Sequence, residues 1–165
     1  MYTGEFAKGK RHGSGVAEEV NGPRYEGEFQ DEKCCGLGVL TVRGRICARG
    51  MFKNGMLHGP GVREIEDGHV AVGEFYKWAQ HGYGKQIRDG GSREGQWKHE
   101  ELHGLGRVAS QAGDYIYQGS FEEDKMHGVG DEFREGVWIR SIRGTFFRER
   151  HEVVHGGAVV LWSGV

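Results

Sequence analysis

The sequence of 165 residues has only 2 prolines and 3 cysteines, and it contains neither a polybasic run nor a long apolar stretch. The scarcity of proline excludes a collagen-like chain and a proline-rich linker. Three cysteines cannot all pair within one chain, and their spacing does not match a secreted disulfide framework. Without clustered positive charge, nucleic acid is not expected as a partner. Without about 20 consecutive apolar residues, no transmembrane helix is expected.

Signals for export and for catalysis are also missing. The N-terminal stretch MYTGEFAKGK lacks the apolar segment of a signal peptide, so we expect a reducing, cytoplasmic setting. No serine lies in a G-x-S-x-G turn, and neither a phosphate-binding loop nor a dinucleotide-binding fingerprint occurs. We therefore predict that the chain is not an enzyme and needs no cofactor.

Glycine, in contrast, is abundant, with 31 of 165 residues (about 19%) against roughly 7% in average proteins. Aromatic residues make up 11% of the chain, which is too many for a disordered chain of this polarity. The glycines must therefore serve a folded structure, and they recur at fixed positions.

A short frame built on these glycines repeats along the chain. Residues 25–29 read Y-x-G-x-F, and residues 35–38 read C-G-x-G where the other copies have H-G-x-G. The residues at the histidine position of the six copies are His12, Cys35, His58, His81, His103 and His127. They are separated by 23, 23, 23, 22 and 24 positions, a regularity that chance does not give. The tyrosine position is eroded in several copies, namely at Ala48, Ala71, Arg93 and Ile142.

Each copy has the pattern of a β-hairpin. Tyr25, Gly27 and Phe29 alternate with Glu26 and Glu28, and this period of two is typical of a strand with one aromatic and one acidic face. A polar turn and a second strand follow. We expect the rings to lie across strand glycines on the same face, because aromatic cover stabilises such glycines. The predicted fold class is all-β: a single-layer antiparallel meander of repeated hairpins, forming an elongated, twisted trough.

The pattern Y-x-G-x-F-x(5)-H-G-x-G resembles the MORN (membrane occupation and recognition nexus) repeat family. We predict one MORN-repeat array over residues 1–165, with six clear repeats over 2–136 and a degraded seventh repeat or cap over 137–165. The resemblance implies a tether between membranes and cytoskeletal or motor proteins. Association with the cytoskeleton or with the inner face of a membrane is expected accordingly.

A protein partner is the main functional prediction. A single-layer sheet has no second layer over its aromatic face, so we expect an amphipathic helix or an extended peptide to bind there. The alternative is that the rings only pack against one another and against the glycines. The predicted groove residues are Tyr25, Phe29, Phe52, Phe75, Trp97, Tyr117 and Phe121. The chain is accordingly predicted to be a non-catalytic scaffold or tether.

Other positions carry further hypotheses. Trp78, with Tyr76 two residues before it, falls in a hairpin turn and is either an interaction hot spot or a ring folded back on its own hairpin. Lys8, Lys10 and Arg11 make the first repeat basic, which favours an anionic phospholipid-binding module as an alternative function. A second alternative, implied by the resemblance, is a regulatory segment of a larger enzyme.

The C-terminal region departs from the repeat by being apolar. We expect it to mediate homodimerisation, because exposed sheet edges pair with other chains, or else to cap the array or contact an additional helix or domain. The residues concerned are Trp138, Ile139, Phe146, Phe147, Leu161 and Trp162.

The histidines and cysteines are predicted to be structural. Equivalent positions of neighbouring hairpins lie about 10 Å apart, too far for histidines of successive repeats to share one metal ion. Cys35 stands at the histidine position of the second repeat, and Cys34 fills the variable position before it. We therefore expect no metal site and no disulfide.

Overall fold

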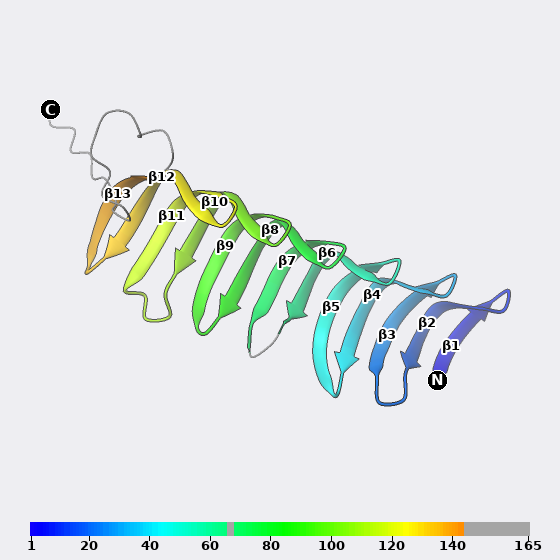
Figure 1. Ribbon diagram of the computed structural model, residues 1–165. Coiled ribbons are helices and arrows are strands. Elements are labelled where there is room, and N and C mark those ends of the chain that lie inside the picture. The colour runs from blue at the N-terminus through cyan, green and yellow to red at the C-terminus, as the bar shows by residue number, and fades with distance from the viewer. Residues whose placement is uncertain (66–67, 144–165) are drawn as a thin grey trace, which may run out of the picture. The chain divides into compact units, whose positions relative to one another are not determined.

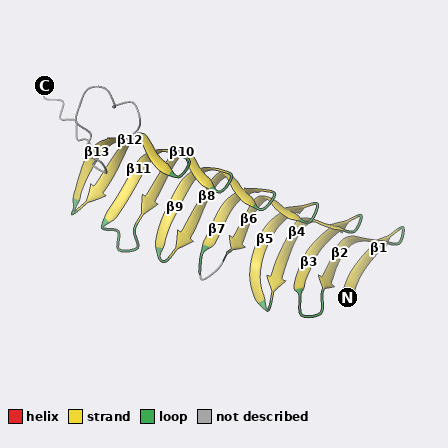
Figure 2. Cartoon of the chain, in the orientation of Figure 1, coloured by secondary structure: helices red, strands yellow, loops and turns green. Residues whose placement is uncertain are grey.

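The computed structural model describes residues 1–65 and 68–143, and these residues form strands and turns without a helix (Figures 1 and 2). The chain divides into two compact units, Met1–Gly84 and Lys85–Val165. Strands in the first unit are β1 (Tyr2–Ala7), β2 (Lys10–Glu18), β3 (Pro23–Gln30), β4 (Lys33–Val42), β5 (Arg45–Lys53), β6 (Met56–Glu64) and β7 (Val70–Tyr76). β8 (Ala79–Arg88) contains the boundary. The second unit continues with β9 (Gly91–Lys98), β10 (Glu101–Ala109), β11 (Tyr115–Glu122), β12 (Lys125–Arg134) and β13 (Val137–Arg143).

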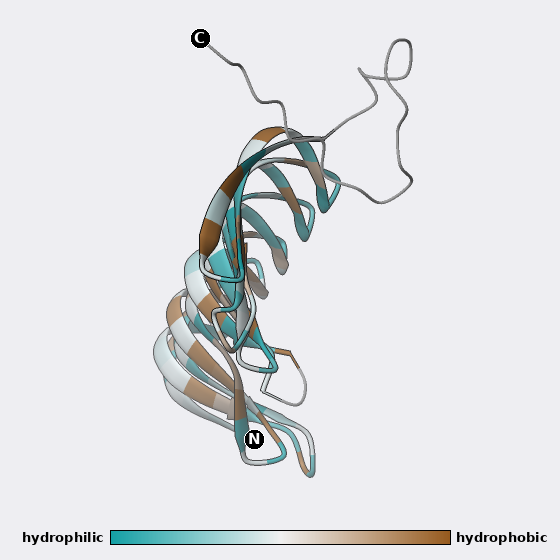
Figure 3. Cartoon of the chain, turned by 90° about the vertical axis from the view of Figure 1, so that its left-hand side faces the viewer, coloured by the Kyte–Doolittle hydropathy of each residue, from teal (hydrophilic) through white to brown (hydrophobic). Residues whose placement is uncertain are grey.

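The strands follow one another in chain order, β1 to β13, in one open antiparallel sheet. Figure 3 shows apolar and polar residues alternating along the strands, as a sheet with two different faces requires. The predicted all-β antiparallel meander of hairpins is thereby confirmed, while the prediction of a single array over 1–165 stays a prediction.

Two-residue turns close the repeat hairpins, and four of these turns also contact the hairpin before them. Both turn residues have positive φ, for example 47° at Asp31 and 75° at Glu32, which is the geometry of a type I′ turn. The second turn residue donates its backbone N–H to a carbonyl of the preceding repeat. These bonds run from Glu32 to Arg11 (3.1 Å), Gly55 to Cys34 (2.9 Å) and Trp78 to Leu57 (2.9 Å) in the first unit, and from Asp124 to Leu102 (3.1 Å) in the second.

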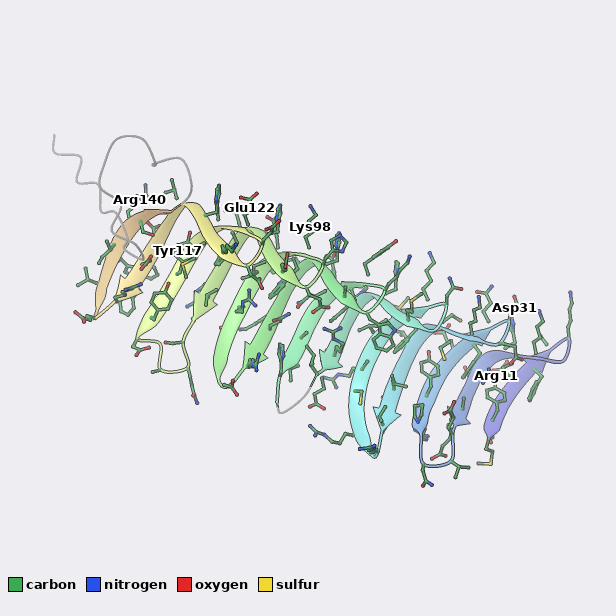
Figure 4. The ribbon with its side chains drawn as sticks, in the orientation of Figure 1. Arg11, Asp31, Lys98, Tyr117, Glu122 and Arg140 are labelled. Carbon is green, nitrogen blue, oxygen red and sulfur yellow. The ribbon has the colours of Figure 1, made fainter. Side chains whose placement is uncertain are left out.

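Tyrosine rings lie directly on pairs of glycines that face each other across two strands. Gly27 pairs with Gly38, and a Cβ atom added at Gly38 would meet the hydroxyl oxygen of Tyr25 at 2.2 Å. The Tyr25 hydroxyl donates to the carbonyl of Cys35 at 3.1 Å. Tyr2 and Tyr117 cover their own glycine pairs in the same way (Tyr117 is labelled in Figure 4). The predicted aromatic cover of strand glycines is confirmed.

The third and fourth repeats, which lack the tyrosine, fill the same space from the opposite strand. Ala48 and Ala71 stand at the tyrosine position, and the residues nine positions later, Leu57 and Gln80, are fully buried. The Leu57 side chain reaches within 3.0 Å of the place where Gly61 would carry a Cβ. In the tyrosine-containing second repeat, the position of Leu57 is taken by the smaller Cys34. Between the second repeat and the third and fourth, the two positions therefore exchange volume: Tyr25 goes with the small Cys34, whereas Ala48 and Ala71 go with the larger Leu57 and Gln80.

This exchange predicts the outcome of a double-mutant cycle. Tyr25→Ala should lower the free energy of unfolding by about 3–5 kcal/mol, because it removes a buried ring and its hydrogen bond. Cys34→Leu should cost about 1–3 kcal/mol in the wild-type background by overpacking. In the Tyr25→Ala background the same leucine should instead restore stability, since the pair then matches Ala48 and Leu57. Urea denaturation gives the free energy of unfolding of all four proteins. If Cys34→Leu destabilises the wild type and Tyr25→Ala equally, the two positions do not compensate each other in volume.

Candidate interaction surfaces

The seven predicted groove residues form the core of the sheet. These residues, each only 0–4% exposed, are Tyr25, Phe29, Phe52, Phe75, Trp97, Tyr117 and Phe121. The rings meet edge to face, with centroids 5.3 Å apart for Tyr25 and Phe29 and 5.1 Å apart for Tyr25 and Phe52. Burial also raises the pKa of Tyr25, whose hydroxyl stays a hydrogen-bond donor. A partner on this face would meet only the margins of these rings, and partner binding there stays a prediction.

The N-terminal end of the aromatic face is more open. Phe6 is 63% exposed, whereas Phe29, at the same repeat position, is 2% exposed. Phe29 is covered by the preceding hairpin, through the Tyr2 ring at 5.1 Å and the Arg11 guanidinium at 5.5 Å. No described hairpin lies before β1 to cover Phe6 in this way. A hollow of about 570 Å³ remains beside it, lined chiefly by Tyr2, Phe6, Arg11, Tyr25 and Cys34.

The two turn aromatics point in different directions. Trp78 is partly buried and packs edge to face on Phe52, with ring centroids 5.9 Å apart. It therefore packs against the preceding hairpin, whereas the sequence-based alternatives are an interaction hot spot or a ring packed on its own hairpin. Tyr76 is 46% exposed and lies between His58 and His81, at centroid distances of 5.2 and 6.1 Å. A partner role for either ring stays a prediction.

Two of the three basic residues in the first repeat are engaged by the second repeat. The Arg11 guanidinium donates to the Glu32 carboxylate (Nε to Oε2, 2.8 Å) and also to the Glu32 carbonyl. Lys10 pairs more loosely with Asp31 at 3.9 Å. Figure 4 shows Arg11 and Asp31 at the turn end of the first two hairpins. Lys8 is exposed in the turn itself. The basic character of this end is thus reduced by the acids beside it.

The carboxylate of Glu32 is held by backbone as well as side-chain donors. The backbone N–H of Arg11, its guanidinium and the nearby positive charges hold the pKa of Glu32 below its ordinary value. A turn carboxylate therefore fixes the preceding repeat. Asp124 acts alike in the second unit, where it accepts from the Leu102 N–H at 2.7 Å and pairs with Arg93.

A structural role for the cysteines and the repeated histidines stays a prediction. The three cysteines are free thiols, and burial raises the pKa of both Cys34 and Cys35, with the Glu28 charge adding to the effect at Cys35. His127 lies 3.5 Å from the Glu122 carboxylate. Within residues 1–65 and 68–143, no group of three or more His, Cys, Asp or Glu side chains is placed to hold a metal ion.

Only part of the predicted dimerisation region is described. Trp138 is 50% exposed on β13 and contacts the Phe133 ring at a centroid distance of 5.4 Å, and Ile139 is partly buried. Phe146, Phe147, Leu161 and Trp162 lie outside the described residues. Dimerisation through this region stays a prediction.

The acidic face of the hairpins has a structural role that the sequence pattern alone does not reveal. The side chain between the repeat glycine and the repeat aromatic accepts a hydrogen bond from the backbone N–H of residue x in H-G-x-G. Glu5 accepts from Ser14 (3.0 Å), Glu28 from Leu37 (3.1 Å) and Gln96 from Leu105 (2.9 Å). The third repeat breaks this pairing at both positions, because Met51 is no acceptor and Pro60 has no N–H. These two departures from the repeat are visible in the sequence and indicate that the outward face of the third repeat differs from that of the others.

Comparison with known proteins agrees with the geometry. The MORN repeat family model matches residues 2–18, 25–41, 49–70, 94–115 and 117–137. The fourth predicted repeat, around His81, is not among these matches, although β7 and β8 occupy its place.

Among residues 1–65 and 68–143, no helix is long and apolar enough to cross a membrane.

The curated relatives are far longer proteins. Alsin from Homo sapiens is 29% identical over 140 residues, which cover 76% of this chain and 8% of alsin, and alsin from Mus musculus aligns equally well. The ALS2 C-terminal-like protein from Homo sapiens is 31% identical over 105 residues, covering 58% of this chain and 11% of that protein. The chain thus spans about a tenth of the length of these relatives.

The salt bridge and hydrogen bonds between Glu32 and Arg11 predict that the stability of the fold depends on pH. Because the pKa of Glu32 is lower in the folded state, its charge stabilises the fold above the unfolded-state pKa, and this stabilisation is lost as the pH falls through the folded-state pKa. Glu32→Gln should therefore lower the urea midpoint at pH 7, and the difference from wild type should shrink at pH 3. Asp31→Asn, which removes only the 3.9 Å contact, is the control. A difference that is the same at both pH values would contradict this role.

Proposed function

Because the chain belongs to the MORN repeat family, we propose that it is a non-catalytic scaffold that holds a partner protein close to a membrane or to the cytoskeleton. The partner segment is an amphipathic helix or an extended peptide on the aromatic side of the sheet. The family match and the hairpin geometry support the scaffold function. The finer assignment depends on the surface that the aromatic side leaves open.

The hollow beside Phe6 is the observation that carries this assignment. The other core rings leave almost no exposed area, so a partner on this side would meet only their margins. Phe6, in contrast, exposes most of its ring next to a hollow of about 570 Å³. A hollow of this volume takes one or two large apolar side chains, and such anchors supply most of the binding energy in many interfaces.

The polar rim of the hollow indicates the flanks of the partner. Glu18, Glu19 and Arg11 line the hollow, and Arg11 already forms an ion pair with Glu32. The rim is therefore acidic where its charges are not already paired. A partner segment with an apolar anchor and neighbouring basic residues would complement it.

The alternative functions have different support. Phospholipid binding through Lys8, Lys10 and Arg11 is weakened by the pairing of Lys10 and Arg11 with Asp31 and Glu32. The regulatory-segment alternative is compatible with the scaffold, because the chain corresponds to a small part of the relatives. In that case the scaffold would act on other domains of the same protein.

Peptide selection tests the proposed function. Peptides enriched against the whole chain from a random linear library should carry a large apolar residue, and Phe6→Ser should weaken their binding at least tenfold, about 1.4 kcal/mol. Val20→Ser, at a residue that is 92% exposed and outside the hollow, is the matched control and should leave the dissociation constant unchanged. Circular dichroism checks that both variants fold. Enriched peptides that bind wild type and Phe6→Ser equally would refute the assignment.

Vesicle sedimentation tests the lipid alternative separately. With two of the three basic side chains paired, we expect the bound fraction to be the same on phosphatidylserine and phosphatidylcholine vesicles at about 0.15 M salt. Binding that requires phosphatidylserine, falls with added salt and is lost on Lys8→Glu would favour a lipid-binding module over the protein scaffold.

A further inference from the structure

The face opposite to the aromatic rings carries an apolar surface on β4–β7, here called the outer patch. Its residues are Leu37, Val39, Met51, Pro60, Val62 and Val72. Leu37 is 63%, Val72 41% and Met51 36% exposed. A shallow depression of about 740 Å³, lined by the first five of these residues, by Arg49 and by Glu26, which is paired with Arg24, lies over it. We propose that the outer patch binds an amphipathic helix of a partner protein, whose apolar stripe contains one carboxylate that pairs with Arg49.

The outer patch exists because the third repeat departs from the others. In the second repeat the corresponding outward position is Glu28, which accepts the Leu37 N–H at 3.1 Å, and in the fifth it is Gln96. Met51 replaces this acceptor in the third repeat, and Pro60 removes the donor that it would have served. Both changes replace a polar group by an apolar one on an exposed face.

The register brings these side chains into one continuous surface. Leu37 faces Met51 directly, and Val62 faces both Arg49 and Val72 across its two neighbouring strands. Directly opposite side chains on one face have Cβ atoms about 4.5–5.5 Å apart, so they touch. Contiguous exposed apolar surface of this kind marks interaction sites.

Arg49 gives the outer patch a chemical preference. It is exposed and stands between Val39 and Val62 on the two adjacent strands. In the part of the chain that the structure describes, Arg49 forms no ion pair, whereas Arg24, at the edge of the same face, pairs with Glu26 at 2.7 Å. A guanidinium among apolar side chains forms a strong bidentate pair when a carboxylate arrives with an apolar surface around it. The complementary partner is therefore apolar with one acidic residue.

The dimensions fit a short helix lying across the strands. The axes of four adjacent strands span about 14 Å, while the outer patch extends over only two outward positions of each strand. Helix residues i and i+11 lie about 16.5 Å apart, so an apolar stripe at i, i+3, i+4, i+7 and i+11 covers this length. An acidic residue within that stripe would lie over Arg49, near the middle of the outer patch.

The inference rests on the proposed scaffold function but uses the other face of the sheet. Its probe is a phage-displayed library of amphipathic helices of about four turns with a randomised stripe, selected against the whole chain. Enriched helices should carry one Asp or Glu in the stripe. Arg49→Glu should weaken them at least tenfold, and a Lys substituted for that acidic residue should restore binding to Arg49→Glu but not to wild type. The double variant Leu37→Ser/Met51→Ser should also weaken the selected helices at least tenfold.

The chain offers a matched control for the apolar contacts. Leu105 has the same repeat position as Leu37, is 67% exposed and likewise donates its N–H to the acceptor of its own repeat, Gln96, but its opposite residue is the polar Ser120. Leu105→Ser should leave the dissociation constant unchanged. Urea midpoints equal to that of wild type show that the variants are folded.

Other outcomes would overturn the inference and leave the proposed function testable. Neutral or basic stripes among the enriched helices, no enrichment at all, or unchanged binding to Leu37→Ser/Met51→Ser would each refute the outer patch as a helix site. Loss of binding on Phe6→Ser alone would assign the helices to the hollow on the aromatic side. Vesicles of neutral lipid that bind wild type but not Leu37→Ser/Met51→Ser would identify a lipid-facing surface instead.

Discussion

The structure depends on one steric constraint: a tyrosine ring can lie flat on two paired strands only where the residues beneath it have no Cβ. At Gly27 and Gly38 this brings the Tyr25 hydroxyl close enough to donate to the Cys35 carbonyl. The buried rings then supply the core that a single-layer sheet otherwise lacks. The paired strand glycines are thus a requirement of the aromatic core, whereas other glycines, such as Gly9 and Gly55, provide the positive φ of the turns.

Much of this could be predicted from the sequence because the constraint acts within one repeat. The period, the hairpins and the aromatic cover of glycine all follow from the spacing of Tyr25, Gly27 and Gly38. The exchange between Tyr25 and Cys34, or Ala48 and Leu57, could not be predicted from one hairpin, because it becomes visible only when the volumes on two strands are compared. Trp78 was ambiguous for a related reason: its contact, Phe52, belongs to an earlier hairpin. The burial of the groove rings likewise depends on neighbours such as Arg11, which no single-repeat pattern includes.

The two candidate surfaces differ in their relation to the repeat. The outer patch appears where Met51 and Pro60 replace a polar pair, whereas Phe6 follows the pattern and is exposed on the edge strand β1 of the described sheet. Away from this edge, positions that obey the pattern are used by the fold itself, as the burial of the seven core aromatics shows. In a repeat protein of this kind, specific recognition is therefore to be sought in the deviations from the consensus and at the sheet edge.

The bonds from hairpin turns to the repeat before them have a consequence for how such chains can change over time. Glu32, Gly55 and Trp78 each donate backward, to a carbonyl one repeat earlier. These three junctions thus have the same polarity and are made by backbone N–H and carbonyl groups. A gene segment coding for one whole repeat can be duplicated or deleted without creating a new kind of junction. The length of the scaffold can therefore vary in steps of one hairpin, while surfaces such as the outer patch keep their local geometry.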